Sequence, residues 1–203
     1  MLTQKQLKDI RKNPDIQNWA SISTVSGLTE EFIREFSNKV HWWYISINQK
    51  LSEGFIREFS DKVDWQQISA YQKFNERFIK EFLHKINWGN ISANQKLSEE
   101  FIRANSDKVY WDLISEYQIL SEEFIIEFSD RLDFKLISRY QKLNEKIIRE
   151  NYNKVSWKWI SRYQKLSEEF IREFPALVNW ELIKKHQQLS PEFIKEFKLD
   201  LIK

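Results

Sequence analysis

The side chains best suited to chemistry are basic and aromatic residues that recur together in the C-terminal half of the chain. Arginine and lysine bind phosphate or carboxylate groups, whereas tyrosine and tryptophan stack on planar rings and dominate protein-binding hot spots. The candidate partner-binding residues are therefore Lys135, Arg139, Tyr140, Lys158, Trp159, Arg162, Tyr163 and Lys185. A smaller apolar group nearer the N-terminus adds Trp43, Tyr44 and Ile47.

Residue types that catalysis or metal binding requires are scarce or scattered. The chain has no cysteine, and its three histidines, His41, His84 and His186, are widely separated. Its three glycines are isolated, so the sequence contains no glycine-rich phosphate loop. We therefore expect no catalytic residue, no metal site, no cofactor and no enzymatic activity.

The composition indicates a folded chain of balanced charge. The 203 residues include 32 basic and 30 acidic side chains, with 41% hydrophobic and 15% aromatic residues. This apolar content is too high for a disordered chain. No apolar run approaches the roughly 20 residues that span a bilayer, and the start of the chain lacks the apolar segment of a signal peptide. We expect a cytoplasmic protein with no membrane partner.

A 23-residue repeat organises the chain from Trp19 onward. An aromatic residue opens each of eight repeats, and isoleucine always follows three residues later. The opening residues are Trp19, Trp42, Trp65, Trp88, Trp111, Phe134, Trp157 and Trp180. Self-similarity at a fixed step predicts a repeat architecture. We expect residues 1–18 to form a capping segment and residues 19–203 to form a single domain.

Each repeat, numbered from its opening aromatic residue, predicts two helices. Positions 14, 15, 18 and 22 are apolar, which is the spacing of one helical face, and position 11 is always a favoured N-cap residue. We call this helix, expected to be the longer one, the phenylalanine helix. Position 23 is often polar (Asp64, Asn87, Asp133, Ser156 and Asn179) and is expected to cap a shorter tryptophan helix, which turns positions 1, 4, 5 and 8 inward.

Such a helix pair cannot bury its aromatic face alone, so neighbouring repeats must stack on it. The predicted fold is all-α: an α-solenoid of eight two-helix repeats, forming an elongated rod or shallow arc. We expect the glutamines at position 8 to satisfy backbone groups at helix ends. We also expect glutamates at positions 12 and 17 to pair with basic residues four positions later on the phenylalanine helix.

The segments LSEGFIREFSDKVDW and ISRYQKLSEEFIREF resemble tandem-repeat proteins of large DNA viruses and phages. The resemblance covers residues 19–203. It implies a viral or phage setting, but it carries no activity and no catalytic residue to this chain.

Positions 2, 3 and 6 of the tryptophan helix vary between repeats and are expected to face outward. Positions 2 and 6 are neutral or apolar in the leading repeats and gain lysine and arginine in the trailing ones, with tyrosine beside them at position 7. Hot-spot residue types in these positions favour a binding surface. Neutral variation of a tolerant surface is the alternative.

The favoured function is a non-catalytic protein-interaction solenoid, a viral or phage factor that binds a host protein or defence complex and blocks it by occlusion. The alternative is nucleic-acid binding through the basic and aromatic ridge of the C-terminal repeats. A third possibility is a homodimer formed by stacking of the solenoid ends. The sequence does not identify the partner.

Overall fold

The structure, a computed structural model, describes residues 2–201 of the chain. These residues form α-helices and two short 3₁₀ helices, with no β-strand among them. They fall into two compact units, unit 1 (Met1–Lys96) and unit 2 (Leu97–Lys203). Pairs of short helices recur throughout both units, which confirms the predicted α-solenoid of two-helix repeats. Residue 1 of the predicted capping segment and residues 202 and 203 of the predicted repeat domain lie outside the described residues.

Unit 1 begins with α1 (Gln4–Lys12) and η1 (Pro14–Ile16), followed by alternating tryptophan and phenylalanine helices. Its tryptophan helices are α2 (Trp19–Thr24), α4 (Trp42–Asn48), α6 (Trp65–Tyr71) and α8 (Trp88–Asn94). Its phenylalanine helices are α3 (Glu30–Glu35), α5 (Glu53–Glu58) and α7 (Glu76–Glu81). In α1, Ile10 is buried and Leu7 packs against the same core, while Lys5 and Lys8 are exposed.

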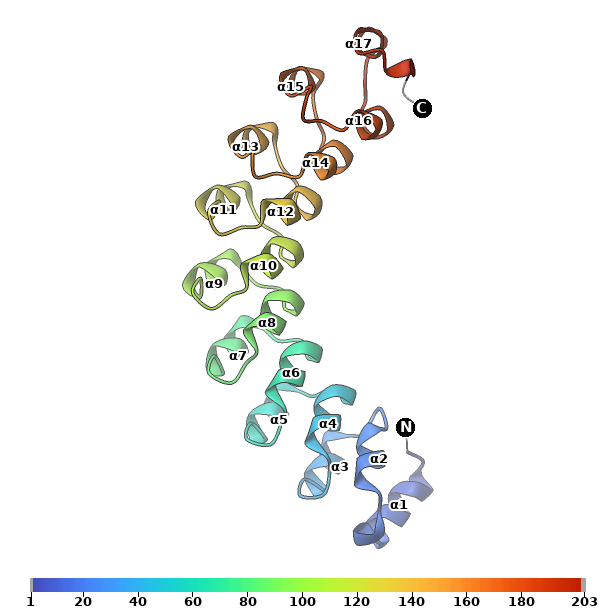
Figure 1. Cartoon of the computed structure of the whole chain (residues 1–203). Helices are drawn as coiled ribbons and strands as arrows, with labels where there is room; N and C mark the ends of the chain where they lie inside the picture. The colour runs from blue at the N-terminus through green and yellow to red at the C-terminus, as the bar shows by residue number, and fades with distance from the viewer. Residues whose placement is uncertain (1, 202–203) are drawn as a thin grey trace. The chain divides into compact units, whose positions relative to one another are not determined.

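Unit 2 continues the same alternation. Its tryptophan helices are α10 (Trp111–Tyr117), α12 (Phe134–Tyr140), α14 (Trp157–Tyr163) and α16 (Trp180–His186). Its phenylalanine helices are α9 (Glu99–Ala104), α11 (Glu122–Glu127), α13 (Glu145–Glu150), α15 (Glu168–Glu173) and α17 (Pro191–Glu196), after which η2 (Leu199–Leu201) follows. Within each unit, the tryptophan helices form one row and the phenylalanine helices a second row (Figure 1). Each tryptophan helix packs on the next one in its row.

The predicted order of helix lengths is wrong. Tryptophan helices contain seven residues, or six in α2, whereas every phenylalanine helix contains six. The phenylalanine helix ends early because position 18 leaves the helical conformation, as at Phe59 with φ −110° and ψ 30°. The Phe59 carbonyl then accepts hydrogen bonds from the N–H groups of Lys62 and Val63, at 2.9 and 3.0 Å. This turn returns Val63 to the core.

The core lies between the two rows and contains the repeat's phenylalanine and isoleucine columns. Phe55 and Ile68, for example, are completely buried. The tryptophans lie at the edge of the core and are half-buried. Trp42 packs on Phe59 with 4.9 Å between ring centroids, and its indole Nε1 donates to the Ser37 carbonyl at 3.0 Å. The ring is therefore packed while its one polar group keeps a partner.

Side chains cap the N-termini of the helices as the sequence predicts, with one exception. The position 11 residue accepts a hydrogen bond from the N–H three residues later in all eight repeats, as Ser52 does from Phe55 at 3.1 Å. At position 23, Asp64, Asn87, Asp133 and Asn179 cap the next tryptophan helix. The predicted cap at Ser156 is wrong, because its side chain makes no capping bond. Its backbone N–H donates to the Ser138 hydroxyl at 3.0 Å, a bond that the capping residue Asp64 also makes, to Ser46.

Each position 8 glutamine binds the backbone of the preceding repeat, which confirms its predicted role. Gln164 is buried. Its Oε1 accepts from the Leu143 N–H at 2.8 Å, and its Nε2 donates to the carbonyls of Ser138 and Gln141 at 3.0 and 2.9 Å. One amide therefore satisfies three backbone groups, the carbonyls of Ser138 and Gln141 at the end of α12 and the N–H of Leu143 in the loop that follows.

Arginine at position 16 also links consecutive repeats. Arg34 lies 2.7 Å from Glu58 of the next repeat and 3.6 Å from Glu30 of its own helix, the second contact being as predicted. The pairs between repeats are Arg34–Glu58, Arg57–Glu81, Arg103–Glu127, Arg149–Glu173 and Arg172–Glu196. Each of these guanidinium groups also lies 4.7–5.2 Å from the centroid of the position 14 phenylalanine in the next repeat.

The expected pairs from glutamate at position 17 to the basic residue at position 21 do not form among the described residues. The helix ends at position 17, so position 21 no longer lies one helical turn away. The other glutamates at position 17 bind an arginine 24 residues earlier, as Glu81 binds Arg57, whereas Glu150 lies 4.0 Å from Lys146 of its own helix. The lysines reach aspartates of the preceding segment, in the pairs Lys39–Asp15, Lys85–Asp61 and Lys154–Asp130.

Replacing Gln164 with methionine tests the glutamine column. Gln164→Met keeps the length of the side chain but leaves the Leu143 N–H and two carbonyls without partners. We expect the free energy of unfolding to fall by about 2–4 kcal/mol, measured by urea denaturation. Gln188→Met, at an exposed glutamine of the same unit, is the control. An equal loss in both variants would contradict the assigned role.

The ion pairs between repeats predict a pH dependence. Hydrogen bonds from Arg57 and Arg149 lower the pKa of the carboxyl groups of Glu81 and Glu173. A lowered folded-state pKa gives stability that is complete above the unfolded pKa, about 4.3, and is lost as the pH falls through the lowered value. The Glu81→Gln/Glu173→Gln variant should therefore unfold at a lower temperature than the wild type near pH 7, and this difference should shrink below about pH 4.

Thermal unfolding followed by circular dichroism from pH 7 to pH 2 measures this difference. Glu123→Gln is the control, because Glu123 is exposed and makes no ion pair within the described residues. Its effect on the midpoint should be small at every pH. A difference between the double variant and the wild type that stays constant down to pH 2 would refute the prediction.

Candidate functional site

Six of the predicted site residues meet on one face of α12 and α14. We call Arg139, Tyr140, Lys158, Trp159, Arg162 and Tyr163 the α12–α14 cluster. The Arg139 guanidinium lies 4.9 Å from the ring centroid of Tyr140 and 4.8 Å from that of Trp159. Trp159 in turn stacks on Tyr163, with 5.7 Å between centroids and 24° between planes. The cluster therefore joins two consecutive repeats through cation–π and stacking contacts.

The remaining members of the cluster complete this arrangement. The Lys158 ammonium lies 5.2 Å from the Trp159 ring, and the Arg162 guanidinium lies 5.2 Å from the Tyr163 ring. Tyr140 and Tyr163 are 42% and 48% exposed. A guanidinium that rests on an aromatic face keeps its N–H groups free to bind carboxylate or phosphate. The cluster thus presents cations that are held on aromatic rings, together with tyrosine side chains that are about half exposed.

The other predicted residues lie outside these ring contacts. Lys135 and Lys185 are exposed on α12 and α16. The apolar group lies on α4 of unit 1, where Trp43 is 43% exposed and meets Tyr44 edge-on, with 4.9 Å between centroids. Ile47 is half-buried, so it offers less surface than its expected outward position implies.

Two equivalent grooves adjoin the cluster, one repeat apart. The first has a volume of about 450 Å³ and is lined by Arg139, Tyr140, Gln141, Lys142, Leu143, Tyr163, Gln164 and Lys165. The second has a volume of about 460 Å³ and is lined by Arg162, Tyr163, Gln164, Lys165, Leu166, His186, Gln187 and Gln188. In the second groove, His186 and Gln188 occupy the repeat positions that Tyr163 and Lys165 hold in the first.

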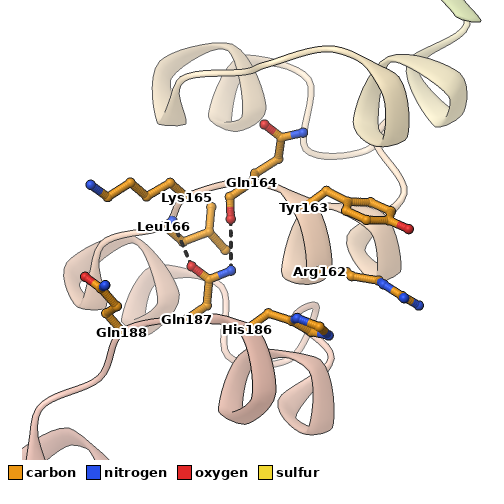
Figure 2. Close-up of a pocket in the computed structure, with 8 residues that line it drawn as sticks. All are labelled: Arg162, Tyr163, Gln164, Lys165, Leu166, His186, Gln187 and Gln188. Atoms are coloured by element: carbon orange, nitrogen blue, oxygen red, sulfur yellow. Dashed lines mark hydrogen bonds between the residues drawn. The ribbon is translucent and has the colours of Figure 1, made fainter.

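Figure 2 shows how the side chains of the second groove are arranged. Gln187 lies at the centre, where its Oε1 accepts from the Leu166 N–H at 3.0 Å and its Nε2 donates to the Gln164 carbonyl at 2.9 Å. Arg162, Tyr163 and His186 extend to one side, and Lys165 extends to the other. The glutamine is engaged with the backbone, so ligand contacts would come from the cationic and aromatic side chains around it.

The sequence analysis missed Lys142 and Lys165, which line these grooves. Both occupy position 9, just beyond the tryptophan helix, where five of the eight repeats have lysine. Because lysine recurs at this position in both units, it resembles a scaffold column rather than one of the variable surface positions. The signal that identifies it is the combination of position 9 lysine with arginine and tyrosine at positions 6 and 7.

The cations around the grooves differ from the arginines of the phenylalanine helices. Within residues 2–201, no ion pair forms at Arg139, Lys142, Lys158, Arg162 or Lys165, whereas the position 16 arginines are all paired with glutamates. Residues 134–142 and residues 157–165 each contain three basic residues and no acidic one. The chain as a whole is nearly neutral, with a net charge of +2, so positive charge is concentrated here.

The positive face begins at α12. One repeat earlier, α10 has Asp112 and Glu116 where α12 has Lys135 and Arg139. The charge of Glu116 and its hydrogen bond raise the pKa of the neighbouring Tyr117 hydroxyl. The sign of the surface charge therefore changes between adjacent tryptophan helices of unit 2.

The described residues provide neither a metal site nor a membrane-spanning helix. Residues 2–201 hold no group of three or more histidine, cysteine, aspartate or glutamate side chains that could bind a metal ion. No helix in that range combines the length and the apolar character needed to cross a bilayer. No protein-family model, curated protein sequence or solved structure matches the chain. The chemistry of the candidate site is therefore argued from its own residues.

Proposed function

We propose that this chain is a non-catalytic binding protein that docks a negatively charged partner along the tryptophan helices of unit 2. The observation that carries the proposal is the set of cations without ion pairs, held on aromatic rings beside two open grooves. The same chain pairs its position 16 arginines closely with glutamates. The chain has 30 acidic residues. Within residues 2–201, none of them forms an ion pair with the cations of this face.

The geometry lowers the cost of ordering these side chains on binding. Arginine loses rotamer freedom when it binds a ligand, but Arg139 is already held between the rings of Tyr140 and Trp159. Preorganisation of this kind improves affinity because less entropy is lost at association. The same rings supply large, rigid contact area, which is typical of binding hot spots.

A protein partner with an acidic surface is one form of this proposal. In that form the rigid repeats would act by covering part of the partner and preventing its other contacts. Blocking of a host protein or defence complex belongs here, and it is supported by the resemblance to viral and phage repeats. Trp43 and Tyr44 of unit 1 would offer a separate apolar surface for a protein contact.

Neutralising two arginines tests whether this face binds anions. We expect Arg139→Gln/Arg162→Gln to weaken binding to heparin, used as a generic polyanion, by about tenfold at low salt, which corresponds to about 1.4 kcal/mol. Elution from a heparin column against a salt gradient gives the readout, and titration calorimetry gives the affinity.

Lys5→Gln/Lys8→Gln is the matched control, because it removes the same charge from exposed residues of α1. The two double variants should unfold at the same urea concentration, since all four residues are exposed. Identical elution of the two variants would show that only net charge matters and would refute the proposed face.

A further inference from the structure

We propose that the two grooves of unit 2 bind single-stranded nucleic acid, with the backbone along the cations and bases against the tyrosine rings. This inference rests on the proposed function, because it names the chemical class of the negatively charged partner. It is carried by three observations: the duplication of the site, the exposed rings within it, and the size of its grooves.

The first observation is that the site occurs twice with nearly the same residues. Residues 135–142 read KLISRYQK and residues 158–165 read KWISRYQK, differing only at Leu136 and Trp159. Two binding elements with the same basic residues and tyrosine, placed at a fixed step, suit a ligand that repeats its own charge at a fixed step. A phosphodiester backbone does so at every nucleotide, whereas the surface of a folded protein carries its carboxylates irregularly.

The spacing of the two elements fits such a backbone. Adjacent tryptophan helices pack directly on each other, as α12 and α14 do, and packed helices lie about 8–10 Å apart. A stacked strand advances about 3.4 Å per nucleotide, so each repeat corresponds to roughly two to three nucleotides. Lys165 lines both grooves, which places a cation at the junction between consecutive binding elements.

The second observation is that each element offers a tyrosine ring beside its cations. Tyr140 and Tyr163 are about half exposed, and Arg139 and Arg162 lie over them. Bases stack on aromatic side chains without regard to sequence, while basic residues hold the phosphates. Base faces are open in a single strand and covered in a duplex, so this arrangement favours the single strand.

The third observation is the volume of the grooves. Each measures about 450–460 Å³ and lies between consecutive repeats. This is within the usual range for sites that hold a small organic molecule, and therefore has room for a nucleotide. An acidic polypeptide could neutralise the same cations, but it would leave the repeated rings without a matching group.

The test compares four fluorescent probes by anisotropy with the full-length chain. They are single-stranded DNA and RNA of about 15 nucleotides in mixed sequence, the corresponding DNA duplex, and a poly-glutamate peptide of equal charge. We expect the single strands to bind more tightly than both the duplex and the peptide. Their affinity should fall roughly fiftyfold between 50 and 200 mM salt if about four phosphates are contacted.

Tyrosine variants separate stacking from charge. Tyr163→Leu removes the ring that lines both grooves and should weaken single-strand binding at least about fivefold. Tyr163→Phe keeps the ring and should bind within about twofold of the wild type. Tyr71→Leu is the matched control, because Tyr71 occupies the same repeat position in unit 1, is 60% exposed and has Ala70 in place of an arginine. Circular dichroism checks that each variant is folded.

The outcomes distinguish the inference of single-strand binding from the proposed function, the docking of a negatively charged partner. Preferential single-strand binding that is lost in Tyr163→Leu and kept in Tyr71→Leu would support both. Poly-glutamate bound as tightly as the oligonucleotides, with no effect of Tyr163→Leu, would overturn the nucleic-acid inference and leave the anionic docking face in place. Equal binding of the duplex would overturn the choice of single strands. No binding of any of the four probes would overturn both proposals.

Discussion

The structure depends on one constraint: its helices are too short for most of their backbone N–H and carbonyl groups to find hydrogen-bond partners within the same helix. An α-helix leaves its first four N–H and last four carbonyl groups without internal partners, so a helix of six or seven residues has few internal bonds. Side chains at repeat positions 5, 8 and 11 supply most of the missing partners. Gln141, for example, accepts from the Leu120 N–H at 3.2 Å and donates to the carbonyls of Ser115 and Gln118 at 3.0 and 2.7 Å. Each repeat is therefore completed by the next one.

This dependence fixes the inner positions and leaves the outer ones open to change. Serine at position 5 and glutamine at position 8 are buried and hydrogen-bonded, as Ser138 and Gln164 are. A substitution there would leave several backbone groups without hydrogen-bond partners. Arginine at position 16 binds the glutamate and covers the phenylalanine of the next repeat. Positions 2, 6, 7 and 9 have no such role in the core. They can carry binding chemistry at little cost in stability, and in α12 and α14 they carry lysine, arginine and tyrosine.

The repeat that opens at Phe134 shows that the inner positions of a repeat can change while its outer positions stay the same. Phe134 is buried where other repeats have a half-buried tryptophan. Ile147 and Asn151 replace the two phenylalanines, and the Asn151 amide donates to the Ile147 carbonyl at 3.0 Å. The Ser129 carbonyl has no indole partner and accepts from the Lys154 ammonium at 3.3 Å, a contact that the equivalent Ser60 carbonyl makes with Lys85 in addition to its indole. The core of this repeat thus differs from that of the other repeats, yet its outer residues match those of the repeat at Trp157, and its Arg139 and Tyr140 belong to the α12–α14 cluster.

The sequence by itself determined the features that recur in every repeat: the two helices, the position 11 caps, the buried columns, the backbone role of glutamine and the outward basic residues. The helices, caps and buried columns follow from periodicity and from bonds between near neighbours in the chain, and the role of glutamine follows from the need of buried polar groups for partners. The tertiary structure decided which of several possible partners a side chain takes. Glu81 has Lys85 four residues later but binds Arg57, because the helix ends before Lys85 and the stacking of repeats brings Arg57 within 2.6 Å. The tertiary structure also decided the grooves, because each groove forms between residues of consecutive repeats, 23 positions apart. The position of Lys165 in both grooves follows from the same stacking.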